Sequence, residues 1–182
     1  MSLQFPLLIK LLAGCGVMVS AIAAFERPSY AQERFSCNER EVATIVNTER
    51  GAVPLIRWTN NSFPPPYSPT ERCKIVSQRF QNFDRNGTLK YIKADSVNNY
   101  PVLCVAAYQG GSCLPNGLLV TFTPGTDANQ ALVRMLDQRV WAAEGALEFC
   151  GGAQCQGQIV SEVDGQTYVN MEGFLSAVND LR

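Results

Sequence analysis

The sequence predicts an α+β domain, in which about three helices pack on one face of a curved antiparallel sheet. Three observations predict this class. Helical segments carry capping residues and apolar stripes, short β-branched segments follow one another through turns, and six cysteines outside an N-terminal leader can staple a single domain with disulfides. The expected order is two strands, a helix, three strands and a second helix, followed by a third helix with room for one more strand before it.

The first helix is the best-marked element. Ser68 and Glu71 form a capping box, and Pro69 occupies the first helical position. Gly87 provides the stop signal. The apolar stripe between these signals consists of Cys73, Val76, Phe80 and Phe83.

Two further helices have weaker signals. One is expected from Asp127, which can cap it together with Gln130, to Gly145, where a glycine would end it. The other is expected over residues 171–181, with Asn170 as its cap. Their expected buried faces consist of Leu132, Val133, Leu136 and Val140, and of Phe174, Leu175 and Val178.

The strands are short apolar or β-branched runs. Residues 42–46 and 53–58 are expected to form a hairpin through residues 49–51. Short strands that follow one another through turns favour antiparallel pairing. Pro54 and Pro101 have no N–H to donate, so we expect each at a sheet edge or a strand start. The later strands are expected over residues 89–92, 102–107 and 118–122, with connections over 95–100 and 109–117.

The first 31 residues have the pattern of a secretory signal peptide. A lysine precedes an apolar run over residues 11–25, and Ser29 and Ala31 place small residues at positions −3 and −1 of a cleavage site. The run is shorter than the roughly 18 apolar residues of a spanning helix. We therefore expect cleavage after Ala31, which leaves residues 32–182 as a single extracytoplasmic domain.

Two alternatives to cleavage stay open. Residues 5–25 could serve as an uncleaved anchor if Lys10 reached the membrane interface. Residues 12–15 also spell a lipobox, in which Cys15 would carry a diacylglycerol. The residues after Cys15 are apolar rather than polar, so the lipoprotein is the minor alternative.

The cysteine count agrees with cleavage. Of seven cysteines, Cys15 lies in the leader, which leaves an even six for disulfides in an oxidising compartment. Six cysteines allow fifteen pairings. We expect a hairpin pair, a pair closing a glycine-containing loop, and a long-range pair made by the remaining two. These are Cys104–Cys113, Cys150–Cys155 and Cys37–Cys73.

Charge and motifs exclude several function classes. Outside the leader, 13 Lys+Arg stand against 15 Asp+Glu, since two of the 15 basic and one of the 16 acidic residues lie within it. No basic cluster exceeds two adjacent residues, so we expect no nucleic-acid partner. Histidine is absent, which excludes Ser-His-Asp and Cys-His catalysis and makes a metal site unexpected. Without a phosphate-binding or dinucleotide motif, we expect no cofactor and no enzymatic activity.

The remaining hypotheses are a binding protein and a hydrolase. We expect a non-enzymatic exported binding or accessory protein, a monomer, that contacts an envelope protein or the membrane periphery. Arg57, Trp58 and Arg79 form the candidate binding surface, because arginine and aromatic residues dominate binding hot spots. A tryptophan packed in the core beneath a stacked arginine is the other interpretation of Trp58. The alternative function is a hydrolase of envelope polysaccharide, which needs two carboxylates about 5–10 Å apart across a cleft.

Ordered sequence blocks add a family resemblance. The blocks are Arg50-Gly51-x-Val53-Pro54-Leu55-Ile56-Arg57-Trp58, Pro69-x-x-Arg72-Cys73-x-x-Val76-Ser77-x-Arg79-Phe80, Gly87-x-Leu89-x-Tyr91-Ile92, Pro101-Val102-x-Cys104, Gly110-Gly111-x-Cys113 and Leu118-Leu119-x-Thr121. Together they resemble the circadian oscillating polypeptide family of cyanobacteria, over roughly residues 35–136. The resemblance implies a leader-bearing, envelope-associated protein in the periplasm, the thylakoid lumen or at the membrane periphery, whose abundance cycles daily. It implies no reaction and no catalytic residues.

Intact-mass analysis of the protein from its native source tests the leader and the cysteines together. The expected mass is that of residues 32–182 with one hydrogen lost from each of six cysteines. A mass that includes the leader, a diacylglycerol or free thiols would contradict the expected processing.

Overall fold

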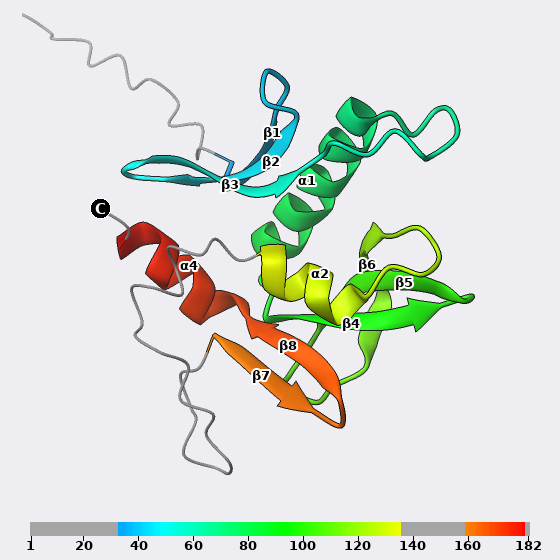
Figure 1. Cartoon of the computed structure of the whole chain (residues 1–182). Helices are drawn as coiled ribbons and strands as arrows, with labels where there is room; N and C mark the ends of the chain where they lie inside the picture. The colour runs from blue at the N-terminus through cyan, green and yellow to red at the C-terminus, as the bar shows by residue number, and fades with distance from the viewer. Residues whose placement is uncertain (1–32, 136–158, 181–182) are drawn as a thin grey trace, which may run out of the picture. The chain divides into compact units, whose positions relative to one another are not determined.

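The strands form two antiparallel sheets in a computed structural model, which describes residues 33–135 and 159–180 (Figure 1). One sheet has the order β1-β2-β3 and the other the order β6-β5-β4-β8-β7. In chain order the elements are β1 (Phe35–Asn38), β2 (Ala43–Thr48), β3 (Gly51–Arg57), α1 (Pro69–Arg85), β4 (Tyr91–Val97), β5 (Tyr100–Ala106), β6 (Cys113–Thr121), α2 (Ala128–Met135), β7 (Val160–Val163), β8 (Gln166–Asn170) and α4 (Met171–Asp180). The α+β class is confirmed, with the strands divided between two sheets instead of gathered in one.

The helices begin where their capping residues predict. The side chain of Ser68 accepts a hydrogen bond from the Glu71 amide at 3.2 Å at the start of α1. Asp127 accepts one from the Gln130 amide at 3.0 Å at the start of α2, and Asn170 caps α4 through the amide of Glu172, also at 3.0 Å. The part of the second expected helix beyond residue 135, with Leu136 and Val140, lies outside the described residues.

Two tight turns extend the second sheet beyond its expected strands. Asn98 and Asn99 both adopt positive φ (50° and 63°), so β4 and β5 meet in a two-residue turn and the expected connection over residues 95–100 is wrong. Asp164 and Gly165, with φ of 52° and 73°, join β7 to β8 in the same way. Asn, Asp and Gly tolerate this backbone region, so both turns have the residues that a short hairpin requires.

Pro54 and Pro101 lie where a missing N–H costs little. Pro54 belongs to β3, an edge strand, and the β2–β3 register shifts beside it: Thr44 pairs with Ile56 but Ile45 pairs with Pro54. Pro101 is the second residue of β5. The expectation of an edge or strand-start position is confirmed for both.

Helix α1 contacts both sheets. It packs against β1 and β2 and also against β6, while α2 contacts β4, β5 and β8. Phe80 of α1 is fully buried and stacks on Phe35 of β1, with ring centroids 5.2 Å apart. One cluster of buried apolar side chains therefore spans both sheets and the helices that the structure describes.

Two of the expected disulfides are present. Cys37 of β1 joins Cys73 of α1, and Cys104 of β5 joins Cys113 of β6, each with Cα atoms 5.6 Å apart. The expected Cys150–Cys155 pair and the leader, with Cys15, lie outside the described residues. Within the described part of the chain, no helix is long and apolar enough to span a membrane.

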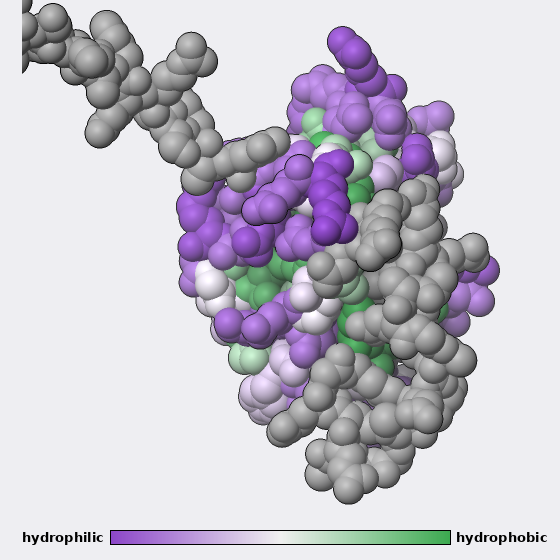
Figure 2. Space-filling model, turned by 90° about the vertical axis from the view of Figure 1, so that its left-hand side faces the viewer, coloured by the Kyte–Doolittle hydropathy of each residue, from purple (hydrophilic) through white to green (hydrophobic). Residues whose placement is uncertain are grey.

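The surface is polar over most of the described residues on the face shown in Figure 2, with a smaller apolar area between the polar side chains. Few large apolar side chains are exposed among the described residues. They are Tyr67, Val97, Tyr100, Tyr108 and Val133.

A buried lysine lies on β4. Lys93 is 4% exposed, and its Nζ is 3.1 Å from Oδ2 of Asp95 and 5.3 Å from the ring centroid of Tyr168. Burial lowers the pKa of Lys93, but Asp95 and the Tyr168 phenol raise it more, so the pKa lies above its ordinary value of 10.5. Asp95 Oδ2 also lies 3.3 Å from Cys113 Sγ, which places this ion pair beside the Cys104–Cys113 disulfide.

Asp95→Asn is expected to destabilise the fold by about 3 kcal/mol at pH 7, because it leaves a buried ammonium without its counter-charge. Urea unfolding measures this loss, and Asp164→Asn in the exposed β7–β8 turn is the matched control.

The same ion pair predicts a pH dependence. Because the folded pKa of Lys93 is raised, the contribution of Lys93 to folding stability is complete below the unfolded value of 10.5 and disappears as the pH rises through the folded pKa. The wild type should therefore lose more stability than Asp95→Asn above pH 10.5; equal losses would contradict the role of the pair.

Candidate binding site around Trp58

Trp58 follows β3 and is buried, with 6% of its surface exposed. Its Nε1 donates a hydrogen bond to Oγ1 of Thr44 at 3.1 Å. The Ser77 hydroxyl of α1 donates to the same oxygen at 3.0 Å. Thr44 is fully buried, so this one oxygen satisfies two buried donors and joins β2, α1 and the end of β3.

Arg72 stacks over Trp58. Its guanidinium carbon lies 4.7 Å from the Trp58 ring centroid and 4.1 Å from that of Phe63, so the cation is held between two aromatic faces. Its Nη1 donates to the Asn60 carbonyl at 3.2 Å. Burial lowers the pKa of Arg72, although a guanidinium stays protonated in proteins. The core tryptophan beneath an arginine is thus the arrangement found, and the arginine is Arg72.

Arg79 lies seven residues after Arg72 and therefore on the same face of α1. Its Nη1 donates to the Leu119 carbonyl of β6 at 2.9 Å. Leu119 is the bulged residue of that edge strand: Leu103 pairs with Val120 and Cys104 with Leu118, which leaves Leu119 without a partner on β5. Arg79 thus provides a donor to the carbonyl of the bulged residue and ties α1 to the second sheet.

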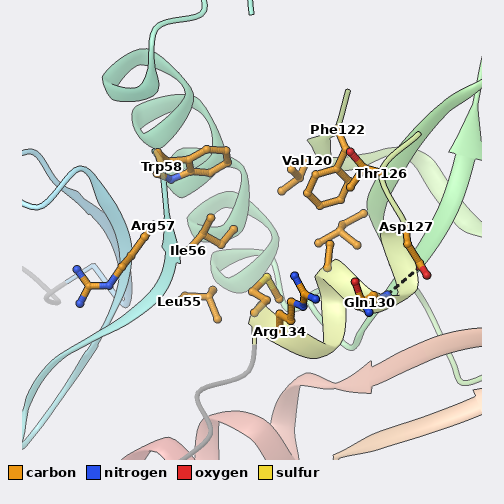
Figure 3. A pocket seen from close by; sticks show the side chains of 13 residues that line it. Leu55, Ile56, Arg57, Trp58, Val120, Phe122, Thr126, Asp127, Gln130 and Arg134 are labelled. Carbon is orange, nitrogen blue, oxygen red and sulfur yellow. Dashed lines mark hydrogen bonds between the residues drawn. The ribbon is translucent and has the colours of Figure 1, made fainter. Parts of the chain in front are cut away.

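Arg57 lines the apolar cavity described below together with Trp58, but it does not line the cavity that contains Arg79. Its side chain is 62% exposed, forms an ion pair with Glu41 at 3.7 Å and points away from the cavity drawn in Figure 3. The three residues singled out in the sequence thus occupy three environments: an exposed ion pair, the core, and a bridge between α1 and β6.

Two cavities flank Trp58. The first, the arginine cavity, has a volume of about 330 Å³ and lies between α1, β6 and the loop before α1. It is lined by Trp58, Phe63, Tyr67, Arg72, Ile75, Val76, Arg79, Leu118, Val120 and Thr121, with no carboxylate among them. The second, the apolar cavity, has a volume of about 490 Å³ and shares Trp58 and Val120 with the first.

The apolar cavity lies between β3 and α2 (Figure 3). Asp127 is its one lining carboxylate, and Gln130 and Arg134 of α2 contribute polar groups. Its lining consists of Leu55, Ile56, Arg57, Trp58, Leu103, Val120, Phe122, Thr126, Asp127, Gln130, Ala131, Arg134 and Met135. A third cavity of about 320 Å³, between β1 and α1, has Glu33 as its one lining acid. Each of these three cavities therefore has at most one carboxylate.

Metal-ligand geometry occurs at one place among the described residues. Atoms of Asp95, Cys104 and Cys113 lie within 4.8 Å of one another. Both sulfurs belong to a disulfide, so neither can ligate as a thiolate.

The sequence interpretation missed Arg72, Phe63 and Arg134. Arg72 could have been found from its seven-residue spacing to Arg79 on a predicted helix. Phe63 belongs to a proline-containing loop whose course over Trp58 has no periodic signal, and Arg134 lies on a helix whose partner elements were not predicted.

These features define an α+β protein that is braced by disulfides and has two cavities around a buried tryptophan. Its sequence matches the family model of the circadian oscillating protein COP23 over residues 34–176. The chain therefore belongs to the circadian oscillating protein COP23 family, as the sequence blocks predicted. Neither the curated proteins nor the solved structures contain a match.

Thr44→Val should cost about 2 kcal/mol of folding stability, because it leaves the Trp58 indole N–H and the Ser77 hydroxyl buried without their acceptor. Urea unfolding followed by tryptophan fluorescence measures the change. Thr70→Val, in the first turn of α1, removes a hydroxyl that has no hydrogen bond to a described residue, and it is expected to stay near the wild type. Equal stability of the two variants would show that the shared oxygen contributes nothing.

Proposed function

We propose that the protein is an exported, non-enzymatic binding or accessory protein of the cell envelope, whose arginine cavity receives a carboxylate-bearing segment of a protein partner. The two disulfides indicate an oxidising, exported environment. Family membership and the signal-peptide pattern of residues 1–31 support export to the periplasm, the thylakoid lumen or the membrane periphery.

The charge of the arginine cavity carries the proposal. Arg72 and Arg79 line it without an acidic residue, and neither forms an ion pair with a described residue. Each guanidinium has five N–H donors and donates one hydrogen bond to a backbone carbonyl of a described residue. The remaining donors suit a carboxylate, which guanidinium binds through short charge-assisted hydrogen bonds.

The rim of the arginine cavity suits a protein partner. Tyr67 is 49% exposed and Phe63 holds one face of Arg72. Arginine and aromatic side chains around a partly enclosed pocket are the usual composition of an interface hot spot. The distribution of acids favours this binding role over hydrolysis by a carboxylate pair, because none of the three cavities presents two carboxylates.

Crosslinking in intact cell envelopes tests the proposal with two substitutions at one exposed position. Tyr67→Glu places a negative charge at the rim and should lower the yield of the partner crosslink about tenfold, through like-charge repulsion. Tyr67→Lys removes the same ring without repelling an acidic segment and should keep more of that yield. Arg40→Gln, on the exposed β1–β2 turn, is the control for a general loss of positive charge.

Equal yields from Tyr67→Glu and Tyr67→Lys would show that the partner does not present an acidic group to this cavity. Loss of the crosslink in Arg40→Gln would place the interface elsewhere. Turnover of envelope polysaccharide by the purified, folded protein would refute the non-enzymatic role.

A further inference from the structure

We propose that the apolar cavity is a second binding site, separate from the arginine cavity, for a small amphiphilic monoanion: a carboxylate attached to an apolar chain. Its volume of about 490 Å³ lies within the 300–1,000 Å³ range of small-molecule sites. Aliphatic and aromatic side chains form most of its lining, so a bound ligand must be largely apolar.

Of the charged side chains that line this cavity, only Arg134 is available to bind a charged group of a ligand. Arg57 points away and pairs with Glu41, so its charge is compensated outside the cavity. Asp127 is engaged as the cap of α2, where its Oδ1 accepts the Gln130 amide. Arg134 extends from α2 toward the space between α2 and α1, and no hydrogen bond or ion pair joins it to a described residue (Figure 3).

A single cation beside an apolar cavity favours a ligand that carries one negative charge on an apolar chain. A second anionic group on the ligand would meet the carboxylate of Asp127. Arg134 is exposed, so its guanidinium is hydrated, and a neutral ligand would use the apolar surface but gain no charge-assisted hydrogen bond from it. The cavity therefore favours an aliphatic carboxylate over the corresponding alcohol or ammonium compound.

Isothermal titration calorimetry of the purified full chain with dodecanoate, below its micelle concentration, tests the site. We expect saturable binding of one dodecanoate per chain and at least tenfold weaker binding of dodecyltrimethylammonium. Arg134→Gln should weaken dodecanoate binding about tenfold by removing a charge-assisted hydrogen bond, while Arg134→Lys keeps most of the affinity. Dodecanol binding should be the same for Arg134→Gln and the wild type.

A steric variant provides an independent test of the location. Ala131 lines the cavity from α2, and Ala131→Phe should abolish binding of dodecanoate and dodecanol alike if the variant unfolds at a temperature near that of the wild type. Arg40→Gln is the control for lost positive charge.

Absence of saturable dodecanoate binding by the wild type would overturn the proposal. Equal affinity of Arg134→Gln and the wild type for dodecanoate would do the same. The Tyr67 variants leave this cavity untouched, so failure here and failure of the partner interaction at the arginine cavity are distinguishable.

Discussion

The attachment of the three-stranded sheet to α1 is the constraint on which the rest of the structure depends. A sheet must bury its apolar face against another element, and α1 forms this second layer for the three short strands. The Cys37–Cys73 bridge fixes β1 to α1 across 36 residues and contributes about 4 kcal/mol in the loop-entropy model. Thr44 adds the polar link at the centre of this layer, and Phe35 the aromatic one.

The same helix lines the arginine cavity, whereas the lining of the apolar cavity comes from the strands, α2 and the residues that flank them. One face of α1 carries the cysteine and serine that hold the first sheet, and a neighbouring face carries Arg72 and Arg79, which reach the loop before the helix and the edge of the second sheet. The long side chains of Arg72 and Arg79 thus connect α1 to the loop before it and to β6 through hydrogen bonds to backbone carbonyls. The arginine cavity lies beside them, and the apolar cavity shares only Trp58 and Val120 with it.

Local signals in the sequence predicted the helix starts, the Cys104–Cys113 disulfide and the positions of Pro54 and Pro101, because capping, hairpin closure and the missing proline N–H act within a few residues. The Cys37–Cys73 disulfide was predicted only because these two cysteines remained after the local pairs were assigned. The local signals did not predict β1, whose alternation of apolar and polar residues covers only four positions, or the separation into two sheets, which depends on tertiary contacts. The site was predicted in part. Trp58 and Arg79 line one cavity, but the cation over the indole is Arg72; its helical spacing to Arg79 could place it on the same face of α1, whereas its stacking on Trp58 depends on tertiary packing.

Pro54 affects how readily copies of the protein associate with one another through a sheet edge. It lies on β3, one of the two edge strands of the smaller sheet, and a strand that lacks one amide hydrogen offers an incomplete template to a second chain. Copies of the protein are thus discouraged from joining edge to edge through this strand into filaments. That protection costs little in the folded molecule, since the register shift beside the proline lets the sheet accommodate it.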